Sequence, residues 1–164
     1  PLTLEPIDLA EIAMKAALEL ESVAFEKNVT LDTNLPEKCV IRGNADYLLR
    51  IVTSLLENAL KYEPAGGQVI LALTQSKRKT VLSVRNPGSR IPEEDLPHVF
   101  DRFYTVDKAH TSGKGTGLGL SICKQILLQH GHDITVQSES GKGTTFTFRL
   151  DRGEGQKTPK ETAK

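Results

Sequence analysis

This 164-residue sequence has no formal net charge, only two cysteines and no long apolar run. Lysine plus arginine number 21 and aspartate plus glutamate also number 21, so no global field draws the chain to nucleic acid or to an anionic membrane. The two cysteines, Cys39 and Cys123, lie in apolar stretches typical of buried thiols, as expected in a reducing cytoplasm. No apolar run approaches the roughly 18 residues of a membrane span, and the first residues are unlike a signal peptide. We expect one domain that recognises its partners through local sites.

What the sequence does contain is a glycine-rich segment, Gly113 to Ile122 (GKGTGLGLSI), that continues into a helical apolar pattern. Glycine allows backbone N–H groups to approach a ligand closely, and a helix N-terminus adds free donors and a partial positive charge. Leu118, Ile122 and Ile126 repeat every four residues, which predicts a helix from Thr116 to about His130 with one buried stripe. The segment is therefore either a phosphate-holding turn or only a tight connection.

Three common phosphate motifs do not match this segment. The dinucleotide fingerprint needs a third glycine where Leu120 stands. The Walker A motif needs Gly-Lys followed by Ser or Thr, whereas Lys114 and Lys142 are each followed by glycine. A protein-kinase glycine loop lies between two strands near the start of a much longer chain, whereas this segment opens a helix near the end. A different nucleotide-binding architecture is therefore required.

Periodicity and turn residues predict the elements around this segment. We expect a short edge strand over 1–7, a helix capped by Asp8 to about 27, strands over 28–33 and 39–42, a helix over 45–62 capped by Asn44, a hairpin of strands 68–74 and 80–85, the helix over 116–130 ended by Gly131, and strands over 133–138 and 144–150. Residues 98–115 show no period and are rich in polar and aromatic residues, as in functional lids. We expect one folded domain over residues 1–150 and a disordered polar tail over 151–164.

The helix over 45–62 carries the most informative polar residues. Opposite its apolar face lie Ser54, Asn58, Lys61 and Tyr62. The first is four residues before Asn58, and the last two are three and four residues after it, so all four share one ridge. Such a ridge is either a ligand face or a plain solvated one. Asparagine is mildly unfavourable inside a helix, and this cost favours a functional reason for its presence.

Four separated motifs resemble the boxes of sensor histidine kinases, in the family's order. Asn58 in LLENALKY resembles the N box, Asn86 with Gly88 the G1 box, residues 100–104 (FDRFY) the F box and residues 113–120 the G2 box, with GKGTTF as the closing glycine turn. The resemblance covers about residues 2–150. It implies an α/β Bergerat fold: a two-layer α/β sandwich in which a mixed five-stranded sheet packs against three helices, with a flexible lid over ATP.

The resemblance also implies roles for individual residues. Asn58 would coordinate Mg2+ through its amide oxygen and Lys61 would meet a phosphate, so these two are the expected catalytic residues and Asn58 the expected metal ligand. Mg2+ prefers oxygen ligands and keeps several waters, so one neutral side chain holds it only together with ATP phosphates. Phe100 and Phe103 would anchor the base of the lid in the core. The expected nucleotide-binding residues are Asn58, Lys61, Tyr62, Asn86, Gly88, Ile91, Tyr104, Lys114, Gly115, Thr116, Gly117, Leu118, Gly119, Leu120 and Thr144.

Three positions depart from the family's pattern. Asn86 stands where the G1 box normally has an aspartate, so its amide oxygen can accept from adenine but without charge, about 1 kcal/mol more weakly. Arg90 replaces the second glycine of that box, and Thr105 replaces an arginine that often follows the F box. These departures leave a second interpretation open: a degenerate nucleotide-binding or scaffolding module with little kinase activity.

The residue one helical turn before Asn58 separates kinases from hydrolases of this fold. Relatives that hydrolyse ATP carry a glutamate there as a base for water, whereas this sequence has Ser54, and Glu57 points about 100° away around the helix. A histidine acceptor already has a free lone pair near its pKa of about 6.5 and needs no such base. We therefore expect phosphotransfer, with a gyrase-like or chaperone-like hydrolase as the disfavoured alternative.

The expected phosphoacceptor lies outside this chain. None of His98, His110, His130 and His132 stands in a His-Glu or His-Asp helix ahead of the ATP domain, and we expect surface or capping roles for them. The resemblance implies transfer to a histidine on the dimerisation hairpin of the same protein, and then to a response regulator of a two-component system. We expect this fragment to be a cytoplasmic domain that contacts neither nucleic acid nor membrane, and the full-length protein to be a membrane-bound homodimer.

Overall fold

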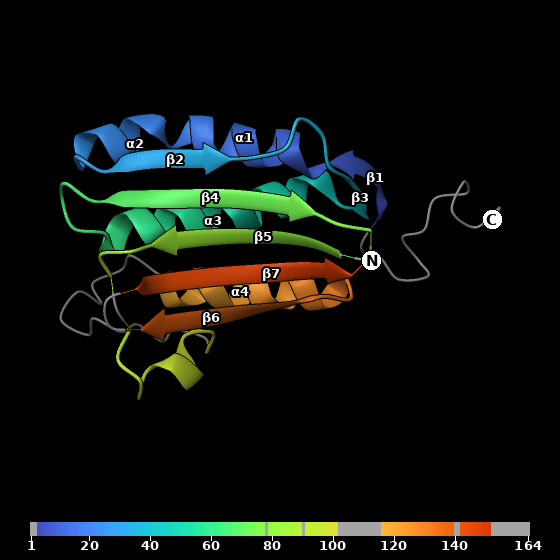
Figure 1. Cartoon of the computed structure of the whole chain (residues 1–164). Coiled ribbons are helices and arrows are strands. Elements are labelled where there is room, and N and C mark those ends of the chain that lie inside the picture. The colour runs from blue at the N-terminus through green and yellow to red at the C-terminus, as the bar shows by residue number, and fades with distance from the viewer. Residues whose placement is uncertain (1–2, 78, 90, 102–115, 140–141, 152–164) are drawn as a thin grey trace.

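The computed structural model describes residues 3–77, 79–89, 91–101, 116–139 and 142–151, except for the side chains of residues 116–118, 150 and 151. These residues form two layers, a five-stranded sheet and a layer of helices that covers one of its faces (Figure 1). The strands, in order across the sheet, are β2 Thr30–Asn34, β4 Gln68–Gln75, β5 Lys79–Asn86, β7 Gly143–Asp151 and β6 Asp133–Glu139. The β2–β4 pair is parallel and the others are antiparallel, so the sheet is mixed and the predicted fold class is confirmed.

A small antiparallel ladder of β1 Glu5–Asp8 and β3 Val40–Gly43 lies at one end of the main sheet (Figure 1). Asp8 connects this ladder to the first helix, because its carboxylate accepts from the backbone N–H of Ala10 at 3.1 Å and of Cys39 at 2.9 Å. One side chain therefore ends a strand, caps a helix and fixes the approach to β3. The predicted cap at Asp8 is confirmed.

The second layer contains four α-helices in the part of the chain that is described: α1 Leu9–Glu19, α2 Glu21–Glu26, α3 Ala45–Tyr62 and α4 Thr116–Gln129; the short 3₁₀ helix η1 Leu96–His98 lies beside β6. The prediction of one helix from residue 9 to about 27 is wrong, because the chain breaks at Leu20, with φ −105° and ψ 6°. Leu20 nevertheless stays buried, and both halves keep the same face inward. Apolar periodicity reports which face is buried, so such a break leaves no trace in it.

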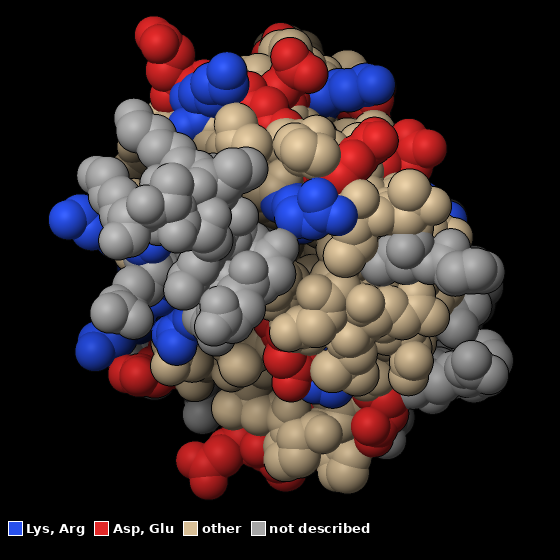
Figure 2. Space-filling view, turned by 90° about the vertical axis from the view of Figure 1, so that its right-hand side faces the viewer, with Lys and Arg blue, Asp and Glu red and all other residues tan. Residues whose placement is uncertain are grey.

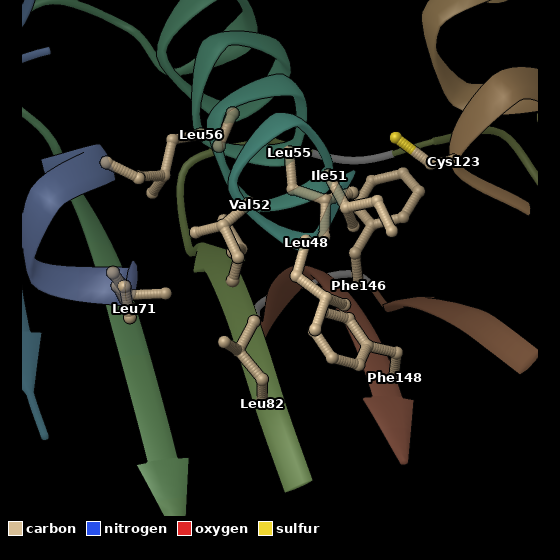
Figure 3. Close-up of a cluster of buried hydrophobic side chains, with 14 of the residues drawn as sticks. Leu48, Ile51, Val52, Leu55, Leu56, Leu71, Leu82, Cys123, Phe146 and Phe148 are labelled. Atoms are coloured by element: carbon tan, nitrogen blue, oxygen red, sulfur yellow. The ribbon is translucent and has the colours of Figure 1, made fainter. Parts of the chain in front are cut away.

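The long helix α3 packs its apolar face on the middle of the sheet. Its bounds and its cap agree with the prediction, and the Asn44 side chain accepts from the backbone N–H of Tyr47 at 3.1 Å. Figure 3 shows the buried face of α3 directed at Leu82 of β5 and at Phe146 and Phe148 of β7. Burying one such side chain contributes about 1.5–3 kcal/mol. The residues of this face, all 0 % exposed, are Leu48, Ile51, Val52, Leu55, Leu56 and Leu60.

Helix α4 buries a different stripe from the predicted one. Ile126 is buried as predicted, but Ile122 is 38 % exposed, and the Leu118 side chain lies outside the described residues. The helix is apolar on most of its circumference. Since an α-helix has 3.6 residues per turn, residues spaced by four lie at successively different angles around it and do not all face the core. Gly131, with φ +83°, ends the helix as predicted. The buried residues of α4 are Leu120, Cys123, Ile126 and Leu127.

His130 joins the end of α4 to the beginning of α3. It is 8 % exposed; its Nε2 accepts from the backbone N–H of Asn44 at 3.2 Å, and its Nδ1 lies 2.9 Å from the carbonyl oxygen of Ile126. Because the N–H of Asn44 can only donate, Nδ1 carries the proton and donates to Ile126. A surface position for His130 is therefore wrong and a capping role fits, because the ring serves two helix ends at once.

The charged side chains on one end of the molecule are mixed in sign. In Figure 2, Lys and Arg alternate with Asp and Glu along the upper edge, and residues of both signs recur lower on this face among uncharged ones. This distribution agrees with the balanced totals of basic and acidic residues in the sequence. None of the helices that the structure describes has the length and hydropathy to cross a membrane.

Candidate functional site

The polar ridge of α3 is largely enclosed rather than solvated. Asn58 is only 9 % exposed, and Ser54, Lys61 and Tyr62 are half-buried. The Lys61 ammonium lies 5.4 Å from the centroid of the Tyr62 ring, within the range of a cation–π interaction. A plainly solvated ridge would expose its asparagine, and burial of an amide is costly without a partner. The placement of Asn58 therefore favours the ligand-face interpretation of this ridge.

The loop that follows β5 lies next to the end of α3. Asn86, the last residue of β5, is 3 % exposed and stands opposite Thr144 of β7, which in turn stands opposite Ser138 of β6. These three polar residues form a row across three strands at one end of the sheet. Ile91, at the other end of the loop, donates its backbone N–H to Ser138 Oγ at 2.7 Å.

A directed chain of hydrogen bonds holds this loop on the sheet. Thr144 Oγ1 donates to the carbonyl oxygen of Ser89 at 3.3 Å and lies 2.9 Å from Ser138 Oγ. Because Thr144 uses its proton on Ser89, Ser138 donates to Thr144 and accepts from Ile91. Thr144 is 1 % exposed, so in this structure its hydroxyl supports the loop. Ser138 was not among the predicted site residues, since only the strand pairing brings it here.

The closing glycine turn packs against the same loop. Gly143 has φ +85°, and a Cβ built on it would overlap Pro87 and lie 2.6 Å from the carbonyl oxygen of Asn86. Both the conformation and the close approach require glycine. The predicted closing turn thus has a specific task here, which is to let β7 begin directly beneath the loop after β5.

Glu63 holds the loop from the opposite side, and sequence reasoning missed it. Its side chain is 7 % exposed. The backbone N–H of Gly88 donates to both carboxylate oxygens at 3.1 Å, and the N–H of Gln68 donates to Oε2 at 3.3 Å. A glutamate just after a helix is ordinarily a surface residue, and only the approach of Gly88, 25 positions later, reveals its task.

Gly119 and Leu120 are the predicted site residues near the beginning of α4 whose surroundings the structure describes. A Cβ built on Gly119 would meet nothing within 4 Å among the described residues, so no neighbour there requires glycine. Leu120 is 7 % exposed and packs in the core, so its predicted nucleotide contact can come only from its backbone. Helix α4 begins at Thr116, the residue at which the sequence predicts a helix to start.

Several predicted residues lie outside the described part of the chain. These are Tyr104, Lys114 and Gly115 of the nucleotide-binding set, the side chains of Thr116 and Leu118, the departures Arg90 and Thr105, Phe103 and His110, residues 102–115 of the predicted lid and residues 152–164 of the predicted tail. Phe100, at the start of the lid, packs edge to face on the buried Phe146 ring, with centroids 5.9 Å apart. Its predicted role as an anchor in the core is confirmed.

Ser54, at the place of the base in hydrolases, lies against Cys123 of α4. Burial raises the pKa of the Cys123 thiol to about 11, and a hydrogen bond with the Ser54 hydroxyl offsets part of this rise. The thiol is therefore protonated and unreactive at neutral pH. Cys39 is also buried, and neither cysteine forms a disulfide, in agreement with the prediction of two buried thiols.

The site offers little to a metal ion by itself. Among the described residues, no group of three or more His, Cys, Asp or Glu side chains could hold one. Asn58 brings a neutral amide oxygen, which is a suitable ligand for Mg2+ only when other oxygens complete the coordination. This donor set fits a metal that arrives with a phosphate-bearing ligand.

Comparison with known proteins agrees with the motifs. Residues 43–154 match the family described as "Histidine kinase-, DNA gyrase B-, and HSP90-like ATPase". The sensor protein SrrB of Staphylococcus aureus is 37 % identical over 147 residues, which cover 89 % of this chain and 25 % of SrrB. The chain thus spans about a quarter of the length of this relative.

Solved structures of histidine kinases share the fold. A mycobacterial sensor histidine kinase, MprB, aligns with a TM-score of 0.73 and 29 % identity over 90 % of this chain and 96 % of that chain. Full-length ShkA in complex with AMPPNP aligns with a TM-score of 0.77 and 25 % identity over 92 % of this chain and 31 % of that chain.

Proposed function

The chain belongs to the histidine kinase-, DNA gyrase B- and HSP90-like ATPase family, and on this premise we propose that it binds Mg-ATP and transfers the γ-phosphoryl group to a protein histidine. The acceptor in this proposal lies on the dimerisation hairpin of the same protein, and a response regulator receives the phosphoryl group next. The full-length protein is proposed to be a membrane-bound homodimer, of which this chain is the cytoplasmic catalytic domain.

One observation carries the proposal: the end of α3 and the loop after β5 are in direct contact. Glu63 follows Tyr62 in the chain, and its carboxylate binds the backbone N–H of Gly88. The contact brings the ridge of Asn58, Lys61 and Tyr62 next to the loop that begins at Asn86. Two motifs that the resemblance assigns to the phosphates and to the base, far apart in sequence, therefore border one site.

The base is proposed to bind at Asn86. Its amide oxygen can accept from the adenine amino group, which is the contact that an aspartate makes in most of the family. The relative ShkA was solved with AMPPNP, an ATP analogue, and this supports an adenine nucleotide as the ligand of the present chain. Tyr62, half-buried at the end of α3, is proposed to lie beside the adenine ring.

Asn58, Lys61 and the N-terminus of α4 are proposed to hold the phosphates. Lys61 brings a point charge, the first turn of α4 brings backbone N–H donors, and Asn58 fits Mg2+ through its amide oxygen. When bound, Mg2+ would neutralise part of the phosphate charge. The contribution of this chain to catalysis is then to position the nucleotide and to balance its charge.

Two of the three histidines that the structure describes have contacts that suit other tasks than phosphate acceptance. His130 is buried and uses both ring nitrogens. His98 is exposed and its Nδ1 lies 3.0 Å from the Asp101 carboxylate. Both observations support an acceptor outside these residues, as the hairpin proposal requires.

A nucleotide-binding or scaffolding module with little turnover is the second candidate, and the observation that favours it is the neutral amide of Asn86 in place of a carboxylate. Hydrolysis is less well supported, because the place of the general base holds Ser54, which is engaged with Cys123.

Calorimetric titration of this chain with AMPPNP, with and without Mg2+, tests the proposal. We expect magnesium-dependent binding that Asn58→Ala abolishes and that Glu57→Ala, an exposed neighbour on the same helix, leaves unchanged. Transfer from labelled ATP to the separately supplied hairpin then distinguishes the kinase from the binding module. Absence of binding in the unmodified chain would refute both candidates that require nucleotide.

A further inference from the structure

The buried carboxylate of Glu63 is too costly to be a simple helix-ending residue. A charge at 7 % exposure needs hydrogen bonds to replace its water, and Glu63 receives them from two backbone N–H groups, those of Gly88 and Gln68. These donors belong to two different segments, the loop after β5 and the start of β4. The carboxylate therefore ties three parts of the chain together, because Glu63 itself continues α3, with its N–H bonded to the carbonyl of Ala59 at 3.0 Å.

Two glycines beside Glu63 leave space for its carboxylate because they carry no side chain. A Cβ on Gly67 would overlap Oε2, and a Cβ on Gly88 would lie 2.6 Å from the same atom. The Cβ built on Gly88 would also lie 3.0 Å from Cδ of Pro64. Gly67 is only four residues after Glu63, whereas Gly88 comes from the loop after β5, 25 positions later. The Glu63 carboxylate thus occupies space that a side chain at either glycine would fill.

We propose that Glu63 is a positioning residue that fixes the base-recognition loop to the helix that holds the phosphates. This inference rests on the proposed function. Lys61 lies two residues and Asn58 five residues before Glu63, and Asn86 lies two residues before Gly88. Because Glu63 binds Gly88 directly, it sets the separation between the base end and the phosphate end of the site. Binding energy is then not spent on ordering the loop.

A carboxylate suits these donors better than an amide does, because the Gly88 N–H approaches both of its oxygens and the Gln68 N–H approaches Oε2. A glutamine has a single acceptor oxygen, and its NH2 group would face one of the two N–H donors. Glu63→Gln therefore keeps the size of the side chain and loses at least one contact. Glu57→Gln is the matched control, since it removes the same charge from an exposed position on the same helix.

The experiment compares two ligands in competition with an ATP analogue labelled on the ribose. Mg-ATP uses both ends of the site, whereas Mg-tripolyphosphate uses only the phosphate end. We expect Glu63→Gln to weaken Mg-ATP about tenfold and Mg-tripolyphosphate less than about twofold. We also expect faster hydrogen exchange at the Gly88 amide, which needs no ligand. Glu57→Gln should change neither.

The ratio of the two affinities does not depend on the folded fraction, since an unfolded chain binds neither ligand. Equal weakening of both ligands would mean a merely structural role and overturn the proposal, as would unchanged affinities together with an unchanged Gly88 exchange rate. If Glu63→Gln does not fold, Gly67→Ala displaces the same carboxylate and should change the same ratio. If the unmodified chain binds neither ligand, the proposed function itself fails. This result differs from one in which the unmodified chain binds both ligands and the Glu63 variant binds them equally well.

Discussion

The loop after β5 and the helix α4 border the same candidate site, but they are fixed in opposite ways. Polar contacts from three elements hold the loop: Glu63 after α3, Ser138 in β6 and Thr144 in β7. Helix α4 is held by apolar packing along one side and by His130 at its far end. The comparison indicates that hydrogen bonds fix the loop proposed to bind the base, whereas core packing fixes the helix proposed to bind the phosphates.

Removing a buried side chain from α4 should have the largest effect. Leu127 is fully buried, so Leu127→Ala should lower the free energy of unfolding by about 2–5 kcal/mol, as measured by urea denaturation. The adjacent Leu128 is 50 % exposed, and Leu128→Ala should stay within about 0.5 kcal/mol of the unmodified protein. Equal effects of the two variants would show that the core does not fix α4.

The His130 contacts should rank next. His130→Ala leaves the N–H of Asn44 and the carbonyl oxygen of Ile126 without their partner, which should cost about 1–3 kcal/mol of unfolding free energy. His98→Ala, at an exposed position, is the control and should be nearly neutral. A neutral His130→Ala would mean that packing alone sets the end of α4.

The hydroxyl of Thr144 tests the hydrogen bonds that hold the loop after β5. Thr144→Val keeps the shape but removes the donor to Ser89 and the acceptor for Ser138, so stability should fall by about 1 kcal/mol. Affinity for Mg-ATP, measured by calorimetry, should fall about fivefold as the loop loosens. Thr145→Val, the next residue along β7, is the control. A loss of stability with unchanged affinity would separate the loop from nucleotide binding.

A substitution at Asn86 should change the affinity for Mg-ATP without weakening the contacts that hold the loop after β5. Asn86→Asp restores a charged acceptor for the adenine amino group, and we expect Mg-ATP to bind about fivefold more tightly, equivalent to about 1 kcal/mol. Calorimetry of the variant and the unmodified chain measures this directly. Weaker binding would reveal a second contact in which the amide N–H2 of Asn86 acts as a donor.

Local patterns predicted the fold well where each element carries its own signals. The bounds of α3 were predicted to the residue, because Asn44 caps it and eighteen residues follow with one apolar face. The hairpin of β4 and β5 followed from alternation around a charged turn. The break at Leu20 and the exposure of Ile122 were missed, because tertiary packing chooses among helix geometries that share one apolar pattern.

The candidate site divides in the same manner. Asn58, Asn86 and Gly88 are predicted from motifs that match a family to which the chain belongs, and their roles stay predictions. Glu63 and His130 could not be predicted, because their partners are distant in sequence and each contact exists only once the chain has folded. Motifs report groups that touch a shared ligand, whereas the supports behind those groups are specific to the individual chain.

The smallest expected effect lies where α4 meets the edge strand at the surface. The Lys124 ammonium, 2.9 Å from Oδ1 of Asp133, lowers the pKa of that carboxyl by hydrogen bonding, and the N–H of Ile134 adds to the effect. A native pKa below the unfolded value stabilises the fold above the unfolded pKa of about 3.9, and this contribution is lost as the pH falls through the native pKa.

Asp133→Asn tests this pair through the pH dependence of unfolding. Asp133 is 54 % exposed, so the variant should be less stable by under about 1 kcal/mol at pH 7, and added salt should reduce the difference. The difference should vanish below the native pKa, where the carboxyl of the unmodified protein is protonated as well. A difference that persists in acid would mean that the carboxyl acts through its neutral hydrogen bonds. The surface pair would then belong with His130 among the polar supports of α4.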